Sequence, residues 1–222
     1  IAMKLPEGVE LVNAGICSED DDVMLTTDSG RAIRFSSTDL RVMNSRASTG
    51  VRGIRLTGND RVVSMSVIRH FEATPEERAA YLKMRRAMAG VSEDEASEDD
   101  VPADPNFSQE RYAEMAAVEN LILTITRGGS GKLSSSHDYP VRGRGGMGVT
   151  AMDKAMRGGA VVASFPVEMS DQIMLVTSNG QSIRCPINGI SFRSRSAGGV
   201  RVFNTSGDAV SYTHLTLPTI SS

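Results

Sequence analysis

The sequence predicts an all-β fold of about three propeller-like blades, each of four antiparallel strands, with a helical and acidic insertion. A segment at residues 21–34 returns at 171–184, and a weaker copy spans 122–129. An Arg-containing phrase that ends in Gly-Val follows each copy, at residues 46–51, 144–149 and 195–200. Gly180 lies 51 residues after Gly129, and this period is the size of a four-stranded propeller blade.

Each copy of the repeat predicts a β-hairpin. Val23–Thr27 is rich in β-forming residues, Asp28–Gly30 is a turn signal, and Arg31–Phe35 alternates polar with apolar residues. In the last copy Ile173–Thr177 and Gln181–Cys185 flank an Asn-Gly turn, whose residues both accept positive φ.

Two further strands are expected after each hairpin. In the first repeat they are Val51–Leu56, beyond an Arg-rich loop, and Arg61–Val67, beyond a Gly-rich turn. The opening residues fit the same period, because Met3–Leu5 precede Ile54–Leu56 by 51 residues. We therefore expect the chain to begin within a repeat and to be an internal fragment of a longer protein.

Residues 71–119 predict an acidic, helical insertion, partly disordered. Gly129 lies 99 residues after Gly30, one period plus 48 residues, so one repeat is interrupted. Thr74, Pro75 and Glu77 form a helix start with a capping box, and Gly90 is a stop signal. The expected inner face of this helix comprises Tyr81, Met84 and Met88, and Ser108 is expected to cap a second helix that runs to about Val118.

Charge is unevenly distributed between the insertion and the repeats. Residues 71–119 hold 13 acidic and 5 basic residues, which leaves 14 acidic and 19 basic residues elsewhere. The repeats are therefore basic, and the overall charge of −3 hides this. The acidic run at 92–105 indicates a solvated, disordered insertion; the alternative is a regulator that competes with DNA for the basic face.

Composition limits the classes of protein to which the chain could belong. Apolar runs are too short for a membrane span, and the first residues do not resemble a signal peptide. Cys17 and Cys185 are expected to be buried, reduced thiols of a cytosolic protein, although a disulfide between them is possible. Residues 212–219 resemble a translated sequencing-adapter tail, so the expected organisation is blade sequence at 1–70 and 120–210, the insertion at 71–119 and an aberrant tail at 211–222.

The repeats resemble the C-terminal domain of the DNA gyrase A subunit, best at residues 22–34, 49–56 and 171–184. The resemblance implies a β-pinwheel, in which neighbouring blades exchange strands and DNA bends around a basic rim. The family's Gln-Arg-Arg-Gly-Gly-Lys-Gly box is most similar to the loop Arg142-Gly143-Arg144-Gly145-Gly146-Met147-Gly148. Here Gly143 replaces an Arg and Met147 replaces the Lys. We call residues 142–148 the box-like loop.

Arginine placement predicts contact with DNA phosphates, because a guanidinium can donate two bonds to one phosphate. No recognition helix is expected, so binding would follow DNA shape and charge. The predicted DNA-binding residues are Arg31, Arg34, Arg41, Arg46, Arg52, Arg55, Lys132, Arg142, Arg144, Arg184, Arg193, Arg195 and Arg201.

No catalytic or metal-binding constellation is predicted. His70, His137 and His214 are scattered, and Gly128–Lys132 lies in a hairpin turn with no following helix, unlike a phosphate-binding loop. The resemblance implies that this chain supports ATP-dependent negative supercoiling by a bacterial, cytoplasmic, nucleoid-associated A2B2 holoenzyme. ATP and Mg²⁺ would be bound elsewhere in it, and other domains would contact a second gyrase A subunit as well as the gyrase B subunit. The alternatives are a propeller-type protein-binding scaffold and the C-terminal domain of the topoisomerase IV A subunit.

Overall fold

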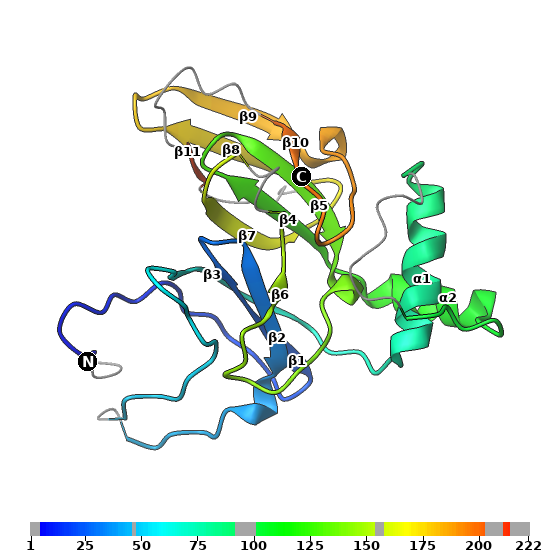
Figure 1. Ribbon diagram of the computed structural model, residues 1–222, viewed down its shortest axis with the longest axis horizontal. Coiled ribbons are helices and arrows are strands. Elements are labelled where there is room, and N and C mark those ends of the chain that lie inside the picture. Colours follow the sequence, from blue (N-terminus) through cyan, green and yellow to red (C-terminus); the bar gives the residue numbers. More distant parts are fainter. Residues whose placement is uncertain (1–4, 46–47, 92–100, 154–157, 203–210, 214–222) are drawn as a thin grey trace, which may run out of the picture.

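The computed structural model describes residues 5–45, 48–91, 101–153, 158–202 and 211–213. Three antiparallel sheets follow one another along the chain, in the orders β3-β1-β2-β6, β10-β5-β4-β7 and β11-β8-β9. The strands are β1 Asp21–Thr27, β2 Arg31–Ser36, β3 Val62–Arg69, β4 Leu121–Thr126, β5 Ser130–Ser135, β6 Val149–Thr150, β7 Val161–Val167, β8 Gln172–Thr177, β9 Ser182–Pro186, β10 Val200–Arg201 and β11 Ser211–Thr213. Figure 1 shows the second and third sheets side by side above the first.

The predicted hairpins are confirmed as β1–β2, β4–β5 and β8–β9. Each hairpin is followed by one turn of 3-10 helix, and these turns are η1 Ser37–Asp39, η3 Ser136–Asp138 and η4 Ile187–Gly189. The turn glycines Gly30, Gly129 and Gly180 all have φ near +80°, which explains why the turn signal recurs. The Arg61–Val67 prediction is confirmed by β3.

Short strands pass between neighbouring blades. Val149 pairs with Ala32, so β6 from the second repeat completes the first sheet. Val200 pairs with Gly131, so β10 from the third repeat completes the second sheet. These are the Gly-Val steps of the repeat, and the exchange matches the pinwheel expectation.

The predicted strand at Val51–Leu56 is wrong. This segment has no strand pairing, and Val51 and Leu56 are exposed. A Gly-Val step becomes a strand by adding to the open edge of the preceding hairpin, and the open edge of β2 is used by β6. The described residues before β1 form no strand that could pair with Val51.

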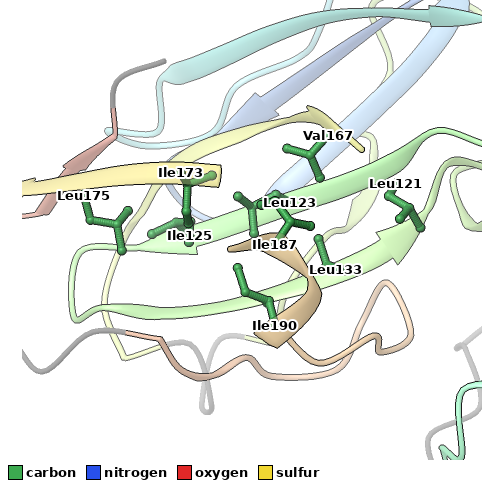
Figure 2. Packing of buried hydrophobic residues seen from close by; sticks show 9 residues of the cluster. All are labelled: Leu121, Leu123, Ile125, Leu133, Val167, Ile173, Leu175, Ile187 and Ile190. Carbon is green, nitrogen blue, oxygen red and sulfur yellow. The ribbon is translucent and has the colours of Figure 1, made fainter. Parts of the chain in front are cut away.

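Two cores join the three sheets. Figure 2 shows Leu123, Ile125 and Leu133 of the second sheet facing Ile173 and Leu175 of β8. On the other face of β4, Ile122 packs with residues of the first sheet, which include Met24 and Ile68. All six residues of β4 are buried because neighbouring sheets cover both of its faces. Burial of this apolar surface is the main stabilising contribution to the blade stack.

The insertion forms two helices that project to one side in Figure 1, α1 Pro75–Met88 and α2 Gln109–Val118. The capping box of Thr74 with Glu77 is present, and Ser108 caps α2, as predicted. Tyr81 is buried with Leu82 and Met115, whereas Met88 is 65% exposed, so the predicted face is wrong at that residue. The inner face turns toward α2, which periodicity within α1 alone does not specify. The acidic residues 92–100 lie outside the described residues.

The remaining expectations concern the cysteines, the tail and the membrane. Cys17 and Cys185 are both free, but Cys17 is exposed and Cys185 is only partly buried, so the predicted burial is wrong for Cys17 and incomplete for Cys185. It lies in an extended segment before β1 rather than in a strand. The backbone of β11 pairs with β8 where β3 and β7 pair in the other sheets, and residues 214–222 lie outside the described residues. In the described ranges, neither the length nor the apolar character of any helix suffices to cross a membrane.

Candidate nucleic-acid interface

Exposed arginines gather where the box-like loop of the second repeat meets residues 52–55 of the first. We call this contact the first junction. The Gly145 N–H donates to the Gly53 carbonyl at 2.6 Å, and the Arg55 N–H donates to the Gly146 carbonyl at 2.8 Å. The exposed arginines at this junction and in the segment that leads to it are Arg41, Arg52, Arg55, Arg142 and Arg144. Contacts between residues distant in sequence therefore bring exposed arginines of two repeats to one junction.

Two of the predicted arginines bind backbone carbonyls at this junction. Arg31 donates from Nε to the Met147 carbonyl at 2.9 Å and from Nη2 to the Gly148 carbonyl at 2.6 Å. Arg144 donates from Nε to the Asp39 carbonyl at 3.1 Å and from Nη1 to the Arg52 carbonyl at 3.3 Å. By contrast, Arg41, Arg52, Arg55 and Arg142 have side chains without a hydrogen bond or ion pair to the described residues.

The second junction, where loop 193–199 meets the second sheet, is closed. Arg195 is 1% exposed and Lys132 is fully buried, so the prediction that they contact DNA is wrong. The Lys132 ammonium donates to the carbonyls of Ser194, Arg195 and Ala197 at 2.9, 2.5 and 2.6 Å. Arg193 is partly buried.

The insertion covers this second junction. Arg85 of α1 stacks on the Phe192 ring at 4.5 Å, and Arg86 donates to the Ser194 hydroxyl at 3.5 Å. The Nε2 atom of His137 in η3 lies 2.9 Å from the Met115 carbonyl oxygen of α2. Since a carbonyl only accepts, the Nε2 must carry the proton. Every residue of η3 is buried, whereas none in the equivalent η1 is buried.

Arg34 is also wrongly predicted to contact DNA. Its side chain is 3% exposed and pairs with fully buried Asp22 at 2.6 Å. It also donates to the Ser136 carbonyl at 2.8 Å and the Arg69 carbonyl at 3.0 Å, and so links the first sheet to η3. Burial lowers the pKa of Arg34, and the Asp22 carboxylate opposes this shift.

His70 extends the hydrogen-bonded network of Arg34 and Asp22 toward solvent. Its Nδ1 lies 2.8 Å from Asp22, and its Nε2 lies 2.8 Å from Glu72. The hydrogen bond to Glu72, with the contribution of Asp22, raises the pKa of His70 above its ordinary value. The protonated ring can donate to both carboxylates at once.

We predict that His70→Gln destabilises the protein at low pH and progressively less at higher pH. A histidine with a raised folded-state pKa adds stability below its unfolded pKa of about 6.5, and this is lost as pH rises through the folded-state value. Urea unfolding of both proteins at about pH 5.5 and about pH 8.5 measures the difference. An equal loss at both values would contradict the prediction.

The other predicted arginines have different positions. Arg201 is exposed in β10 and directly follows a Gly-Val step, as Arg52 does. Arg184 is exposed in β9 and pairs with Met174, as Arg34 pairs with Met24 in the first sheet. Arg184 is therefore the repeat equivalent of a residue buried between blades. Arg46 lies outside the described residues.

Sequence reasoning missed three exposed arginines, Arg61, Arg69 and Arg127. Arg61 is 73% exposed and pairs with Asp28 at 3.2 Å. Arg127 occupies the β4–β5 turn, where the other hairpins carry Asp28 and Ser178. Only a comparison of turn positions between repeats could have indicated it. Among the residues that the structure describes, no group of three or more His, Cys, Asp or Glu side chains could hold a metal ion.

Comparison with known proteins gives consistent family matches. A family model described as DNA gyrase C-terminal domain, beta-propeller, matches residues 21–69, 120–168 and 171–212, which are the three repeats without the insertion. The DNA gyrase A subunit of Granulibacter bethesdensis is 45% identical over 95% of this chain and 24% of the relative. The DNA gyrase A subunit of Rickettsia bellii is 40% identical over 91% of this chain and 22% of the relative. The chain thus spans about a quarter of the length of these relatives.

Solved structures show the same fold at low sequence identity. A C-terminal domain of DNA topoisomerase IV aligns with a TM-score of 0.66 and 17% identity, over 96% of this chain and 52% of that structure. The E. coli ParC C-terminal domain aligns with a TM-score of 0.55 and 16% identity, over 94% of this chain and 66% of that structure. The three-sheet arrangement is therefore shared with these structures.

Proposed function

The chain belongs to the family of DNA gyrase C-terminal β-propeller domains, and we propose on that premise that it binds and bends double-stranded DNA. The observation that carries the proposal is the exposed arginine cluster at the first junction. Each guanidinium can donate a forked pair of hydrogen bonds to a phosphate. The cluster lies along a contact between two blades. DNA that binds arginines of both blades would therefore run along the blade edges.

The curated relatives favour gyrase over topoisomerase IV. Relatives at 40% identity and above are gyrase A subunits, whereas the topoisomerase IV structure shares the fold at 17% identity. A protein-binding scaffold is the other alternative. A scaffold needs no unpaired cations on its surface, whereas Arg52, Arg55 and Arg142 have side chains without polar partners in the described residues.

In the whole protein, this domain would present a bent DNA segment to the cleavage site of a type IIA topoisomerase. We infer an A2B2 assembly with the gyrase B subunit in the bacterial cytoplasm, associated with the nucleoid. Strand cleavage, ATP and Mg²⁺ would belong to other parts of the holoenzyme. The residues of this chain would supply charge and shape, and they would bind DNA with little dependence on sequence.

The combined substitution Arg52→Gln, Arg55→Gln and Arg142→Gln is expected to lower DNA affinity about 10²-fold at about 0.1 M salt. Each neutralised phosphate contributes about 0.9 to the slope of log K against log salt. If each of the three arginines neutralises one phosphate, the slope therefore becomes shallower by about 2.7. A mobility-shift titration of the full chain over salt concentration measures both quantities.

A charge-matched variant controls for the loss of positive charge. Arg61→Gln, Arg69→Gln and Arg127→Gln remove the same charge at exposed positions outside the first junction. This variant should change the slope much less. Equal effects of the two triple variants would argue against a localised interface, and absence of salt-sensitive binding by the unmodified chain would favour the protein-binding scaffold.

A further inference from the structure

The two blade junctions share one arginine contact. At the first junction, Arg144 donates from Nε to the carbonyl of Asp39 in η1. At the second junction, Arg195 donates from Nε to the carbonyl of Asp138 in η3, at 2.9 Å. The residues correspond in the repeat, because Arg195 follows Arg144 by 51 residues and Asp138 follows Asp39 by 99.

The Nη1 atom of each guanidinium binds the segment that follows the Gly-Val step of the preceding repeat. Nη1 of Arg144 donates to the carbonyl of Arg52, and Nη1 of Arg195 donates to the carbonyl of Thr150 at 2.5 Å. Arg52 and Thr150 both directly follow the Val of a Gly-Val step. One side chain thus joins three pieces of chain: its own loop, a 3-10 turn and a Gly-Val segment.

The second junction, which the insertion covers, indicates the role of this arginine contact. Arg195 is 1% exposed beneath the neighbouring elements, so no phosphate can approach its guanidinium. It nevertheless makes the same pair of bonds as the exposed Arg144. The shared contact therefore has an intramolecular role, and the exposure of Arg144 does not make it a phosphate ligand.

A second cation binds the loop carbonyls at each junction. Arg31 binds the carbonyls of Met147 and Gly148, and Lys132 binds three carbonyls of the loop at the second junction. A cation that is bonded to carbonyl oxygens orients the loop backbone. Arg31 is half-buried, and its Nε and Nη2 atoms both donate to the box-like loop rather than to solvent.

We propose that Arg144 and Arg31 are positioning residues, which hold the box-like loop against residues 52–55 so that Arg52, Arg55 and Arg142 form the phosphate-binding set. This inference rests on the proposed DNA-binding function. It divides five arginines of the first junction by role: two act through backbone carbonyls, and three face the DNA. Arg144 in the first role reaches two carbonyls on two segments with one planar side chain, whereas the salt-dependent part of phosphate binding follows from charge.

Lysine substitutions separate the two roles, because lysine keeps the charge and loses the fork. Arg144→Lys is expected to lower the thermal midpoint of the DNA-free chain by about 2–4 °C. It is also expected to weaken DNA binding several-fold at a temperature where circular dichroism shows the variant fully folded. The matched variant Arg142→Lys should retain both the midpoint and the salt slope of the unmodified chain.

Glutamine substitutions provide the opposite contrast. Arg142→Gln should leave the midpoint unchanged and make the salt slope shallower by about 0.9. Arg195→Lys at the covered junction should lower the midpoint and leave the salt slope unchanged. These results together would support separate positioning and phosphate-binding roles.

The proposal is overturned if Arg144→Lys has the midpoint and affinity of the unmodified chain while Arg144→Gln loses one phosphate contact from the salt slope. That pattern would make Arg144 a phosphate ligand. Failure of the proposed function is distinguishable, because it would appear as absence of salt-sensitive DNA binding in the unmodified chain. The midpoints of Arg144→Lys and Arg142→Lys would still decide whether Arg144 joins the blades.

Discussion

Replacing Gly148 with alanine is expected to destabilise the protein by about 3–5 kcal/mol, on the order of a 10 °C fall in thermal midpoint. Gly148 has φ of +70°, and a Cβ at this position would lie 2.3 Å from the Ala32 carbonyl oxygen. Ala32 pairs with Val149, the residue after Gly148, in the contact that lets β6 join the first sheet. The clash can be relieved only by moving β6 away from β2, which would open the first junction.

Gly50 is a matched control within the same chain. It precedes Val51 as Gly148 precedes Val149, and it has φ of +75°, but a Cβ there would meet nothing within 4 Å. Gly50→Ala should therefore cost only the backbone strain, about 1–2 kcal/mol. Urea unfolding of both variants gives the comparison. Equal losses would mean that strand exchange at β6 contributes little to stability.

The contrast between these two glycines shows how far the repeat could be interpreted from sequence. Turn residues and alternation predicted the hairpins β1–β2 and β8–β9 because both signals are local. Whether a Gly-Val step forms a strand depends on an open edge in another blade, and this is not local. The prediction therefore succeeded for the period and failed for Val51–Leu56.

The same limit applies to the candidate site. Arg52 and Arg142 are exposed at the first junction, and their contact with DNA stays a prediction. Arg34, Lys132 and Arg195 are instead buried and bonded within the protein, whereas Arg184, the repeat equivalent of Arg34, is exposed. Charge and spacing are the same in both settings, so sequence could not separate a surface cation from a buried one.

The insertion adds a contact that no repeat could predict. Its helices cover η3 and the second junction, so the two junctions differ although their sequences correspond. The acidic composition of the insertion indicated a solvated element. The structure shows that Tyr81 and Met115 are also buried, and Tyr81 meets the ring of His137 edge-on at 4.9 Å. The helical part of the insertion is therefore a structural support for the second blade.

Replacing Asp22 with alanine is expected to destabilise the protein by about 3–5 kcal/mol, because it leaves the buried Arg34 guanidinium without its counter-ion. Asp22 is fully buried and also accepts from His70, so its removal takes the carboxylate away from two partners at once. Unfolding in urea at neutral pH measures the loss. The exposed pair of Arg61 with Asp28 is the control, and Arg61→Gln should change stability by less than about 1 kcal/mol.

A double-mutant cycle with Arg34→Met tests whether the loss belongs to the pair. If the unpaired charge causes it, the double variant should be less destabilised than the sum of the single variants, by about 1–3 kcal/mol. Arg34→Met should also leave the salt slope of DNA binding unchanged, because its guanidinium is bonded to Asp22, Ser136 and Arg69 inside the protein. Additive single effects would contradict the pairing argument, and a shallower slope would return Arg34 to the interface.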